Sequence, residues 1–246
     1  MENLKLDKVN AEVKKHVTPY LEQLLNLHRN NLISINLYGS AVTNGFSLKT
    51  SDINLLIVCK KVELADLKKS LKLVSRGITK KIAAPLFLTL EHIKTSQDVF
   101  PMEFLEMKEN HICLYGEDLL QNLEINKDHI RLFCEEQIKG KLIRLRQAYL
   151  EIGLKKKGIE SLMKESMYSL IPVFRNLIRL KGINPPVDKQ SVLVTIADEF
   201  KLDEDVFTAI LKEKKNDEKI GGEDAEVYFG KYLDQIQILA IIVDSL

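Results

Sequence analysis

The sequence predicts an α/β domain with a mixed sheet, followed by an all-helical bundle. Strand patterns alternate with helical patterns up to about residue 115, and only helical periodicity continues beyond residue 128. No repeat or low-complexity segment interrupts either part. We therefore expect two domains, residues 1–120 and residues 121–246, each large enough to bury its own core.

The first elements follow from the spacing of apolar residues. Helical spacing runs from Asn10 to His28, and Pro19 is expected to mark a restart of that helix. Strict alternation from Ile33 to Tyr38 predicts a strand with one buried face. The almost continuously apolar run from Ile53 to Cys59 predicts a strand covered on both faces. Apolar residues at steps of three and four predict an amphipathic helix over residues 64–78.

Two more strands are expected before the domain boundary. The apolar segment Ala83–Leu90 predicts a third strand, and Phe100–Met107 predicts a fourth. The residues from Glu106 to His111 are then expected to form a strand end and a solvated turn, and residues 115–118 a turn.

Only helices are expected in the second half. Apolar steps of three and four continue from Cys134 to Ile152 and predict a long amphipathic helix. A second helix is expected from Ser161 to Leu180, with a kink at Pro172. Three further helical patterns follow, over Val192–Phe200, Val206–Leu211 and Ala225–Val243. Together they predict a helical bundle.

Composition and charge restrict the class of protein. The chain is 45% hydrophobic and 29% charged, as in soluble globular proteins, and its net charge of +1 provides no global field for nucleic acid or membrane. Three cysteines without metal-ligand spacing are expected to be small core residues in a reducing compartment. A polar N-terminus and the short apolar run Ile236–Val243 predict no signal peptide, no membrane partner and a cytoplasmic location.

The motif that bears on function begins with Gly39-Ser40, directly after the first predicted strand. A glycine-containing loop at residues 41–51 leads to Asp52 and Asn54 at the start of the second strand. Because side chains alternate along a strand, Asp52 and Asn54 are expected on one face. The glycine would let backbone N–H groups approach a phosphate, and Ser40 would donate another hydrogen bond.

Acidic residues on that face would bind Mg²⁺, a hard cation that prefers oxygen ligands. Glu103, in the predicted fourth strand, is the candidate third acidic ligand. A slip of that strand's register would bring Glu106 inward instead.

This arrangement resembles the nucleotidyltransferase superfamily, the broad group that includes DNA polymerase beta and the aminoglycoside nucleotidyltransferases. The family pattern is a Gly-Ser pair, a loop of about ten residues, an acidic-hydrophobic-acidic strand start, and a third acidic residue on a later strand. Gly39, Ser40 and Asp52 match this pattern, and Glu103 matches the third acidic position. The resemblance covers roughly residues 30–118 and implies a nucleoside triphosphate substrate with Mg²⁺ or Mn²⁺.

The sequence departs from the family at two points. Asn54 stands where the second carboxylate belongs, and residues 42–44 lack an arginine that is often found there. An asparagine can ligate Mg²⁺ through its carbonyl oxygen, but it brings no charge to balance the metal and the triphosphate.

Two functions therefore stay open. In the first, the protein transfers a nucleoside monophosphate from a nucleoside triphosphate to an unknown acceptor, with low activity because of Asn54. Gly39 and Ser40 would bind the nucleotide, while Asp52, Asn54 and Glu103 would be the catalytic metal ligands. In the second, the protein is a non-catalytic nucleotide-binding or regulatory module that retains the fold. A substrate cleft between the domains is expected, and a protein partner could bind the helical domain.

Two groups of residues in the helical half allow more than one interpretation. A basic run on the first long helix fits a solvated face, or a contact with a triphosphate or nucleic acid. Tyr168, Arg175 and Arg179 share one face of the second helix, and they fit either a cleft or the surface. The basic run consists of Lys139, Lys141, Arg144, Arg146 and Lys155-Lys156-Lys157.

Overall fold

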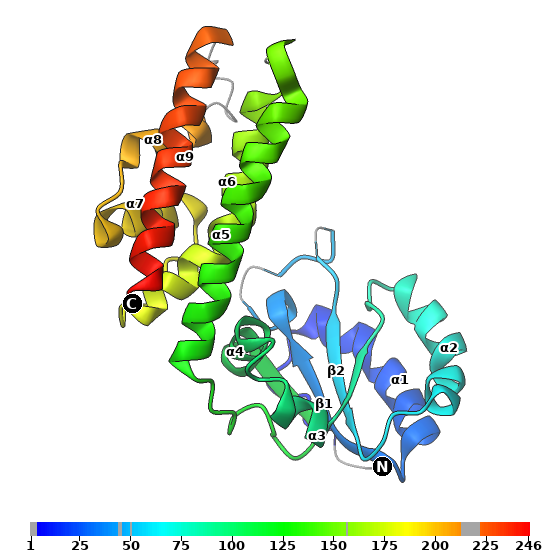
Figure 1. Cartoon of the computed structure of the whole chain (residues 1–246). Coiled ribbons are helices and arrows are strands. Elements are labelled where there is room, and N and C mark those ends of the chain that lie inside the picture. The colour runs from blue at the N-terminus through cyan, green and yellow to red at the C-terminus, as the bar shows by residue number, and fades with distance from the viewer. Residues whose placement is uncertain (1–3, 44–45, 50, 156, 213–221) are drawn as a thin grey trace. The chain divides into compact units, whose positions relative to one another are not determined.

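The structure is a computed structural model that describes residues 4–43, 46–49, 51–155, 157–212 and 222–246 (Figure 1). The chain forms two compact units, Met1–Asn126 and Lys127–Leu246. The first contains a mixed sheet with helices, and the described part of the second contains only helices, so the predicted fold class is confirmed. The limits of the predicted domains, 1–120 and 121–246, and the cleft between them stay predictions.

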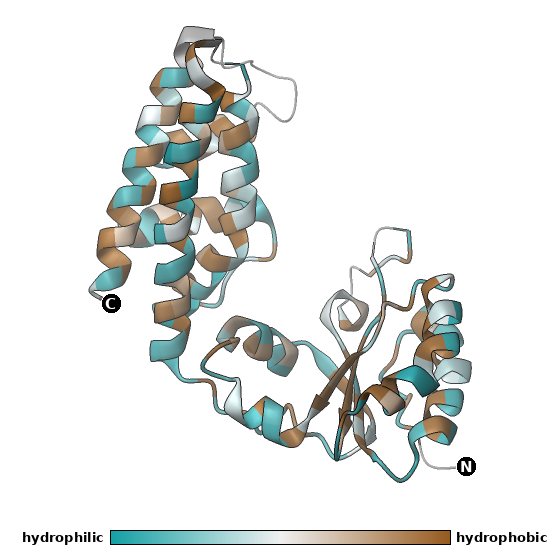
Figure 2. Cartoon of the chain, turned by 45° about the vertical axis from the view of Figure 1, so that its right-hand side comes forward, coloured by the Kyte–Doolittle hydropathy of each residue, from teal (hydrophilic) through white to brown (hydrophobic). Residues whose placement is uncertain are grey.

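A four-stranded sheet forms the centre of the first unit, in the order β3-β2-β1-β4. Strand β1 pairs antiparallel with both β2 and β4, whereas β2 pairs parallel with β3. Figure 2 shows that the central strands are almost uniformly hydrophobic, whereas the helices carry both hydrophobic and hydrophilic residues. The strands are β1 (Leu32–Tyr38), β2 (Asn54–Cys59), β3 (Leu86–Thr89) and β4 (His111–Gly116).

Helices cover both faces of this sheet. Helices α1 (Ala11–His28) and α2 (Leu64–Ile78) pack on one face, and α3 (Leu90–Thr95) and α4 (Pro101–Glu109) on the other. Helix α1 runs through Pro19 without the predicted restart. Because helices cover both faces of the sheet, strand β1 is buried on both faces rather than one. Its polar residues Ser34 and Asn36 are fully buried, and the Asn36 amide donates to the Ser34 hydroxyl at 3.2 Å.

The prediction of a fourth strand at Phe100–Met107 is wrong, because these residues begin helix α4. Pro101 occupies the first turn of the helix, where its missing N–H costs no hydrogen bond; in a central strand it would remove one. The fourth strand is β4, which overlaps the two predicted turns only at its ends, His111 and residues 115–116. The third strand is shorter than Ala83–Leu90, because it begins at Leu86. It ends at Thr89, whose side chain caps α3 by accepting from the His92 N–H at 3.0 Å.

Helix α2 has the predicted bounds, but its leucine-rich face is exposed. The face that packs on the unit carries Asp66, Ser70, Leu73 and Gly77. The Ser70 hydroxyl bonds the Nε2 of buried His28 on α1 at 2.7 Å, and burial lowers the pKa of His28. A hydrogen bond and a small residue thus join α1 to α2. The exposed face, which we call the leucine stripe, consists of Leu64, Leu67, Leu71 and Ile78.

Two of the three cysteines are core residues, as predicted. Burial raises the pKa of Cys59 to about 11 and the pKa of Cys134 to about 12, so both thiols stay neutral. Cys113 is only partly buried, because it lies on the edge strand β4.

The second unit contains the long helices that the sequence predicts. Its core includes Phe174, Phe207 and Tyr232, whose rings meet edge to face, and the Tyr232 hydroxyl lies 3.1 Å from that of buried Ser166. Pro172 lies inside α6, and the kink there stays a prediction. Within the described ranges, none of the helices combines the length and apolar character that a membrane crossing needs. The helices are α5 (Lys127–Ile152), α6 (Ile159–Leu180), α7 (Lys189–Phe200), α8 (Glu204–Lys212) and α9 (Gly222–Asp244).

Part of the basic run on α5 is engaged within the second unit. Lys139 pairs with Glu135 and with Asp244 on α9, and Arg146 donates to the Gln237 side chain at 2.9 Å. These contacts favour a solvated helix face for those two residues. Lys156 lies outside the described residues.

The aromatic and basic residues on α6 also make local contacts. The Lys189 ammonium lies 4.7 Å from the centre of the Tyr168 ring, and Arg175 donates to the Val187 carbonyl. Arg179 donates to the Asn176 side chain at 3.1 Å. Their predicted place in a cleft stays a prediction.

The orientation of α2 can be tested with two leucines that lie two positions apart. Leu73 is 5% exposed, so Leu73→Ala should lower the free energy of unfolding by about 2–5 kcal/mol. Leu71 is 63% exposed, so Leu71→Ala should change it by no more than about 0.5 kcal/mol. Urea unfolding followed by circular dichroism would measure both. A larger loss for Leu71→Ala would mean that the leucine stripe packs against the protein.

Candidate functional site

One face of the sheet carries a row of three polar side chains from three strands. Tyr38 on β1 is the partner of Asn54 on β2 and of His111 on β4. Directly paired residues share a face, so Asn54, Tyr38 and His111 lie on the same side of the sheet. Burial raises the pKa of Tyr38, which keeps its hydroxyl protonated as a hydrogen-bond donor.

The Gly39-Ser40 turn follows that row directly. Gly39 has φ +76, in the left-handed region that glycine enters without strain, and starts a 3₁₀ helix that ends at Val42. The first N–H groups of such a helix have no partner inside it. The Gly39 N–H donates to the Asn110 carbonyl at 3.0 Å, so the N–H groups of Ser40 and Ala41 are the donors left at the turn.

The structure brings this turn against Asn54. A Cβ atom built on Gly39 would lie 3.4 Å from the Asn54 Nδ2 atom. The Ser40 residue is exposed, while Ala41 is buried and anchors the turn in the core. The Ser40 carbonyl accepts from the Thr43 N–H at 3.0 Å and from its hydroxyl at 2.9 Å, which fixes the end of the turn.

Asp52 and Asn54 flank a residue that points the other way. Ile53 is fully buried in the core beneath α1 and α2, so its two neighbours point toward the opposite side of the strand, as the sequence predicts. The Asp52 side chain is 57% exposed, and its Oδ1 lies 3.8 Å from the Lys81 Nζ.

Lys81 is a residue of this site that the sequence analysis missed. It has φ +64, which costs a non-glycine residue about 1–2 kcal/mol. Its carbonyl accepts from the Ile53 N–H at 2.7 Å, and that bond helps to hold the backbone there. The only sequence signal is its position just after the lysine-rich helix α2, and nothing in the sequence indicates a positive φ. The Lys81 ammonium thus places a positive charge beside Asp52.

Glu103 does not lie on a strand, so the argument that assigned it to the face of Asp52 and Asn54 is wrong. It lies in the first turn of α4 and is exposed. Glu106, the alternative, lies on the same helix and is exposed as well.

The remaining donors fit one divalent cation rather than two. Asp52 offers one carboxylate and Asn54 one amide oxygen, and Mg²⁺ commonly uses one or two carboxylates together with substrate phosphates and water. Among the residues that the structure describes, no group of three or more His, Cys, Asp or Glu side chains suits a metal ion. A second cation would have no further carboxylate from β2.

A groove of about 540 Å³ lies along the edge strand β4. One wall carries His111, whose Nε2 lies 2.8 Å from the Asp118 carboxylate and whose Nδ1 lies 3.0 Å from the Lys108 carbonyl. Lys5 and Lys8 of the N-terminal segment form part of the other wall. The groove therefore borders the polar row at its His111 end.

No family model matches the sequence, and no curated protein matches it either. Solved structures do match. One is a spectinomycin adenyltransferase from Enterococcus faecialis, in a crystal structure with ATP and spectinomycin. The TM-score is 0.53 at 12% sequence identity, and the match covers 91% of this chain and 99% of that chain.

The fold is shared with an adenyltransferase. At 12% identity the comparison shows the fold alone, and function must be argued from the site. This shared fold is the one expected from the family resemblance of Gly39, Ser40 and Asp52.

The conformation of the turn can be tested with two glycines. Gly39→Ala should lower the free energy of unfolding by about 1–2 kcal/mol, because alanine resists φ +76. Gly140 lies inside helix α5 with nothing within 4 Å of an added Cβ, so Gly140→Ala should raise it by about 0.5–1 kcal/mol. Thermal or urea unfolding would measure both. Equal effects of the two substitutions would contradict a left-handed Gly39.

Proposed function

We propose that the protein binds a nucleoside triphosphate at the Gly39-Ser40 turn and transfers its nucleoside monophosphate to an acceptor. The observation that carries the proposal is the close approach of Gly39 to Asn54, which joins the turn to the strand start that carries Asp52. The adenyltransferase with the same fold was crystallised with ATP, which supports a nucleotide as the ligand.

The turn would bind the phosphates. The Ser40 hydroxyl and the N–H groups of Ser40 and Ala41 are donors, and oriented N–H groups at a turn attract anions. The Lys81 ammonium beside Asp52 would add a positive charge for the triphosphate. The buried Ala41 and the bond from Gly39 to Asn110 keep these donors in place before the nucleotide arrives.

Asp52 and Asn54 would hold one Mg²⁺ or Mn²⁺. Such an ion neutralises phosphate charge and polarises the phosphoryl group that is transferred. In the transfer, an acceptor oxygen bonds to the α-phosphorus as pyrophosphate leaves. Asn54 supplies no negative charge, so metal binding should be weak and transfer slow.

A second function is favoured by the charges around Asp52. Asn54 is neutral and the Lys81 Nζ lies 3.8 Å from the Asp52 carboxylate, so a divalent ion would compete with Lys81 for Asp52. A non-catalytic nucleotide-binding module would have this arrangement, with Lys81 rather than a metal contacting the phosphates. The two functions differ in whether nucleotide binding and transfer depend on the metal.

Phosphate binding at the turn can be tested by calorimetry with ATP and with GTP. Ser40→Ala should weaken binding by about 1.5–3 kcal/mol, the cost of losing a hydrogen bond to a charged group. Ser75→Ala, at an exposed position of α2, removes the same hydroxyl elsewhere and should leave the affinity unchanged. Equal affinities of wild type, Ser40→Ala and a folded Gly39→Val would remove the nucleotide from this turn.

The role of the metal can be tested with three substitutions on the same assay. Asn54→Asp adds a carboxylate and should tighten Mg²⁺-dependent nucleotide binding, whereas Asp52→Ala should abolish that dependence. Asp98→Ala removes an exposed carboxylate elsewhere and is the control. Labelled triphosphates with Mg²⁺ or Mn²⁺ would measure transfer. Tighter metal binding by Asn54→Asp without any transfer would favour the non-catalytic module, and equal metal dependence in all variants would refute a metal site at β2.

A further inference from the structure

The leucine stripe on α2 has the spacing of a helix–helix contact. Together with the half-buried Val74, its residues follow one another at steps of three, four, three and four, the heptad spacing that lets one helix pack along another. Leu64 is 68% exposed and Leu71 is 63% exposed, so the described part of this chain does not cover the stripe. Single exposed leucines are common on soluble proteins, whereas a continuous row of them marks an interaction surface.

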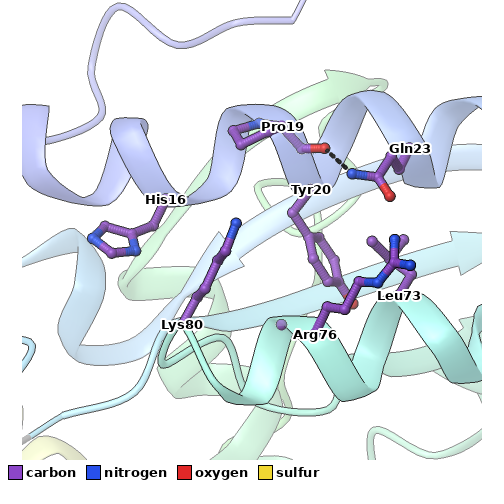
Figure 3. Close-up of a pocket in the computed structure, with 8 residues that line it drawn as sticks. His16, Pro19, Tyr20, Gln23, Leu73, Arg76 and Lys80 are labelled. Atoms are coloured by element: carbon purple, nitrogen blue, oxygen red, sulfur yellow. Dashed lines mark hydrogen bonds between the residues drawn. The ribbon is translucent and has the colours of Figure 1, made fainter.

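The stripe faces away from α1. Figure 3 shows Leu73 and Arg76 extending from α2 toward α1, and a Cβ atom on Gly77 would lie 2.7 Å from the Tyr20 Cε2 atom of α1. These residues therefore mark the flank of α2 that packs beside α1. At 3.6 residues per turn, the centre of the leucine stripe lies roughly 150° around the helix from that flank.

Helix α2 lies at the β3 end of the sheet. It connects β2 to the parallel neighbour β3, and a crossover helix of this kind packs over the two strands that it joins. Helix α1 leads into β1, further inside the sheet, whereas β3 is the last strand in the order β3-β2-β1-β4. Because the stripe faces away from α1, it faces outward past the edge of β3.

The outer edge of β3 offers unpaired backbone groups. The Ile53 N–H donates to the Lys81 carbonyl and the Ile53 carbonyl accepts from the Ala83 N–H, so Ile53 and alternate residues after it, including Ile57, direct their backbone groups toward β3. Phe87 is the partner of Ile57 in the parallel register, and such a partner directs its own groups the other way. The Phe87 N–H and carbonyl therefore face outward. The Leu-Phe-Leu-Thr sequence of β3 has no charge that would keep another strand away.

A single two-fold axis would pair both of these features with a second copy of the chain. An axis perpendicular to the sheet beside β3 sets two β3 strands antiparallel, so that the two Phe87 residues exchange both backbone hydrogen bonds. Strands lie about 4.8 Å apart, so a helix above the β2–β3 pair would lie about 9.6 Å from its copy, within the 8–10 Å at which helices pack. The two leucine stripes then face each other. This agreement between strand spacing and helix spacing favours a second copy over an unrelated partner.

We infer that two copies of the chain form a symmetric dimer through the leucine stripe and the outer edge of β3, which joins their two four-stranded sheets into one. The stripe spans only two heptads and β3 only four residues, so the monomer predominates in dilute solution and the dimer at high concentration. The exposed Lys68 and Lys72 lie beside the stripe in each copy, and salt should strengthen the dimer by screening their repulsion. The residues of the proposed nucleotide site take no part in this contact.

The test is sedimentation equilibrium of the full-length protein over about 1–300 µM, a range that covers weak dimers. Wild type should form a dimer as its concentration rises, and more readily at high salt. Leu64→Ser/Leu71→Ser changes the two most exposed residues of the stripe and should weaken dimerisation at least about ten-fold. The matched control Ile143→Ser/Leu150→Ser changes two exposed residues of α5 and should dimerise like wild type.

Amide hydrogen exchange tests the strand pairing separately. In wild type the Phe87 N–H should exchange more slowly at about 300 µM than at about 5 µM, because its bond to the second copy protects it. Leu64→Ser/Leu71→Ser should lose that protection. The inference is overturned if the protein stays monomeric over the whole range, if the two double variants dimerise equally, or if exchange at Phe87 does not depend on concentration. A monomer that binds vesicles of phosphatidylserine and phosphatidylcholine through Leu64 and Leu71 would overturn it too, since a lipid surface would then cover the stripe.

Discussion

The register between β1 and β2 determines where the Gly39-Ser40 turn lies relative to Asp52 and Asn54. Pairing Tyr38 with Asn54 brings the Gly39 turn to the strand start, and burial of Ile53 in the core directs Asp52 and Asn54 to the other side. A slip by one residue would turn Ile53 outward and bury Asp52, at a cost that the apolar core excludes. The core thus selects the register, and the register assembles the site.

Much of the first unit could be predicted because its central elements have strong patterns. The long apolar run of β2 fits only a buried strand, and the Gly-Ser pair after β1 fits only a turn. The segment from Phe100 to Gly116 fits more than one structure. Its nine helical residues contain too few turns for a clear period, and β4, an edge strand with only Leu114 fully buried, lacks an apolar run. Glu103 was misassigned because its role depended on that uncertain strand.

Two features of the molecule leave no sequence signal at all. The helical spacing predicts α2 correctly, but spacing cannot tell which face of the helix packs inward. In α2, a histidine–serine hydrogen bond and a tyrosine–glycine contact replace leucine packing. The positive φ of Lys81 belongs to the C-terminal end of α2, where the Lys81 N–H donates to the Ile78 carbonyl and the Ile82 N–H donates to the Gly77 carbonyl. A glycine usually marks that left-handed position, and a lysine does not. The inward face of α2 depends on tertiary structure, whereas the turn at Lys81 is local and lacks the residue that would reveal it.

The leucine stripe has a consequence for how the protein behaves at high concentration. Apolar side chains that face water attract one another, and a molecule with a net charge of +1 and a pI near 7.7 has almost no overall repulsion at neutral pH. Lysines on the same helix, among them Lys68 and Lys72, provide local repulsion instead. Salt screens such charges over about 8–10 Å, so the colloidal stability of this chain depends on ionic strength more than its composition indicates.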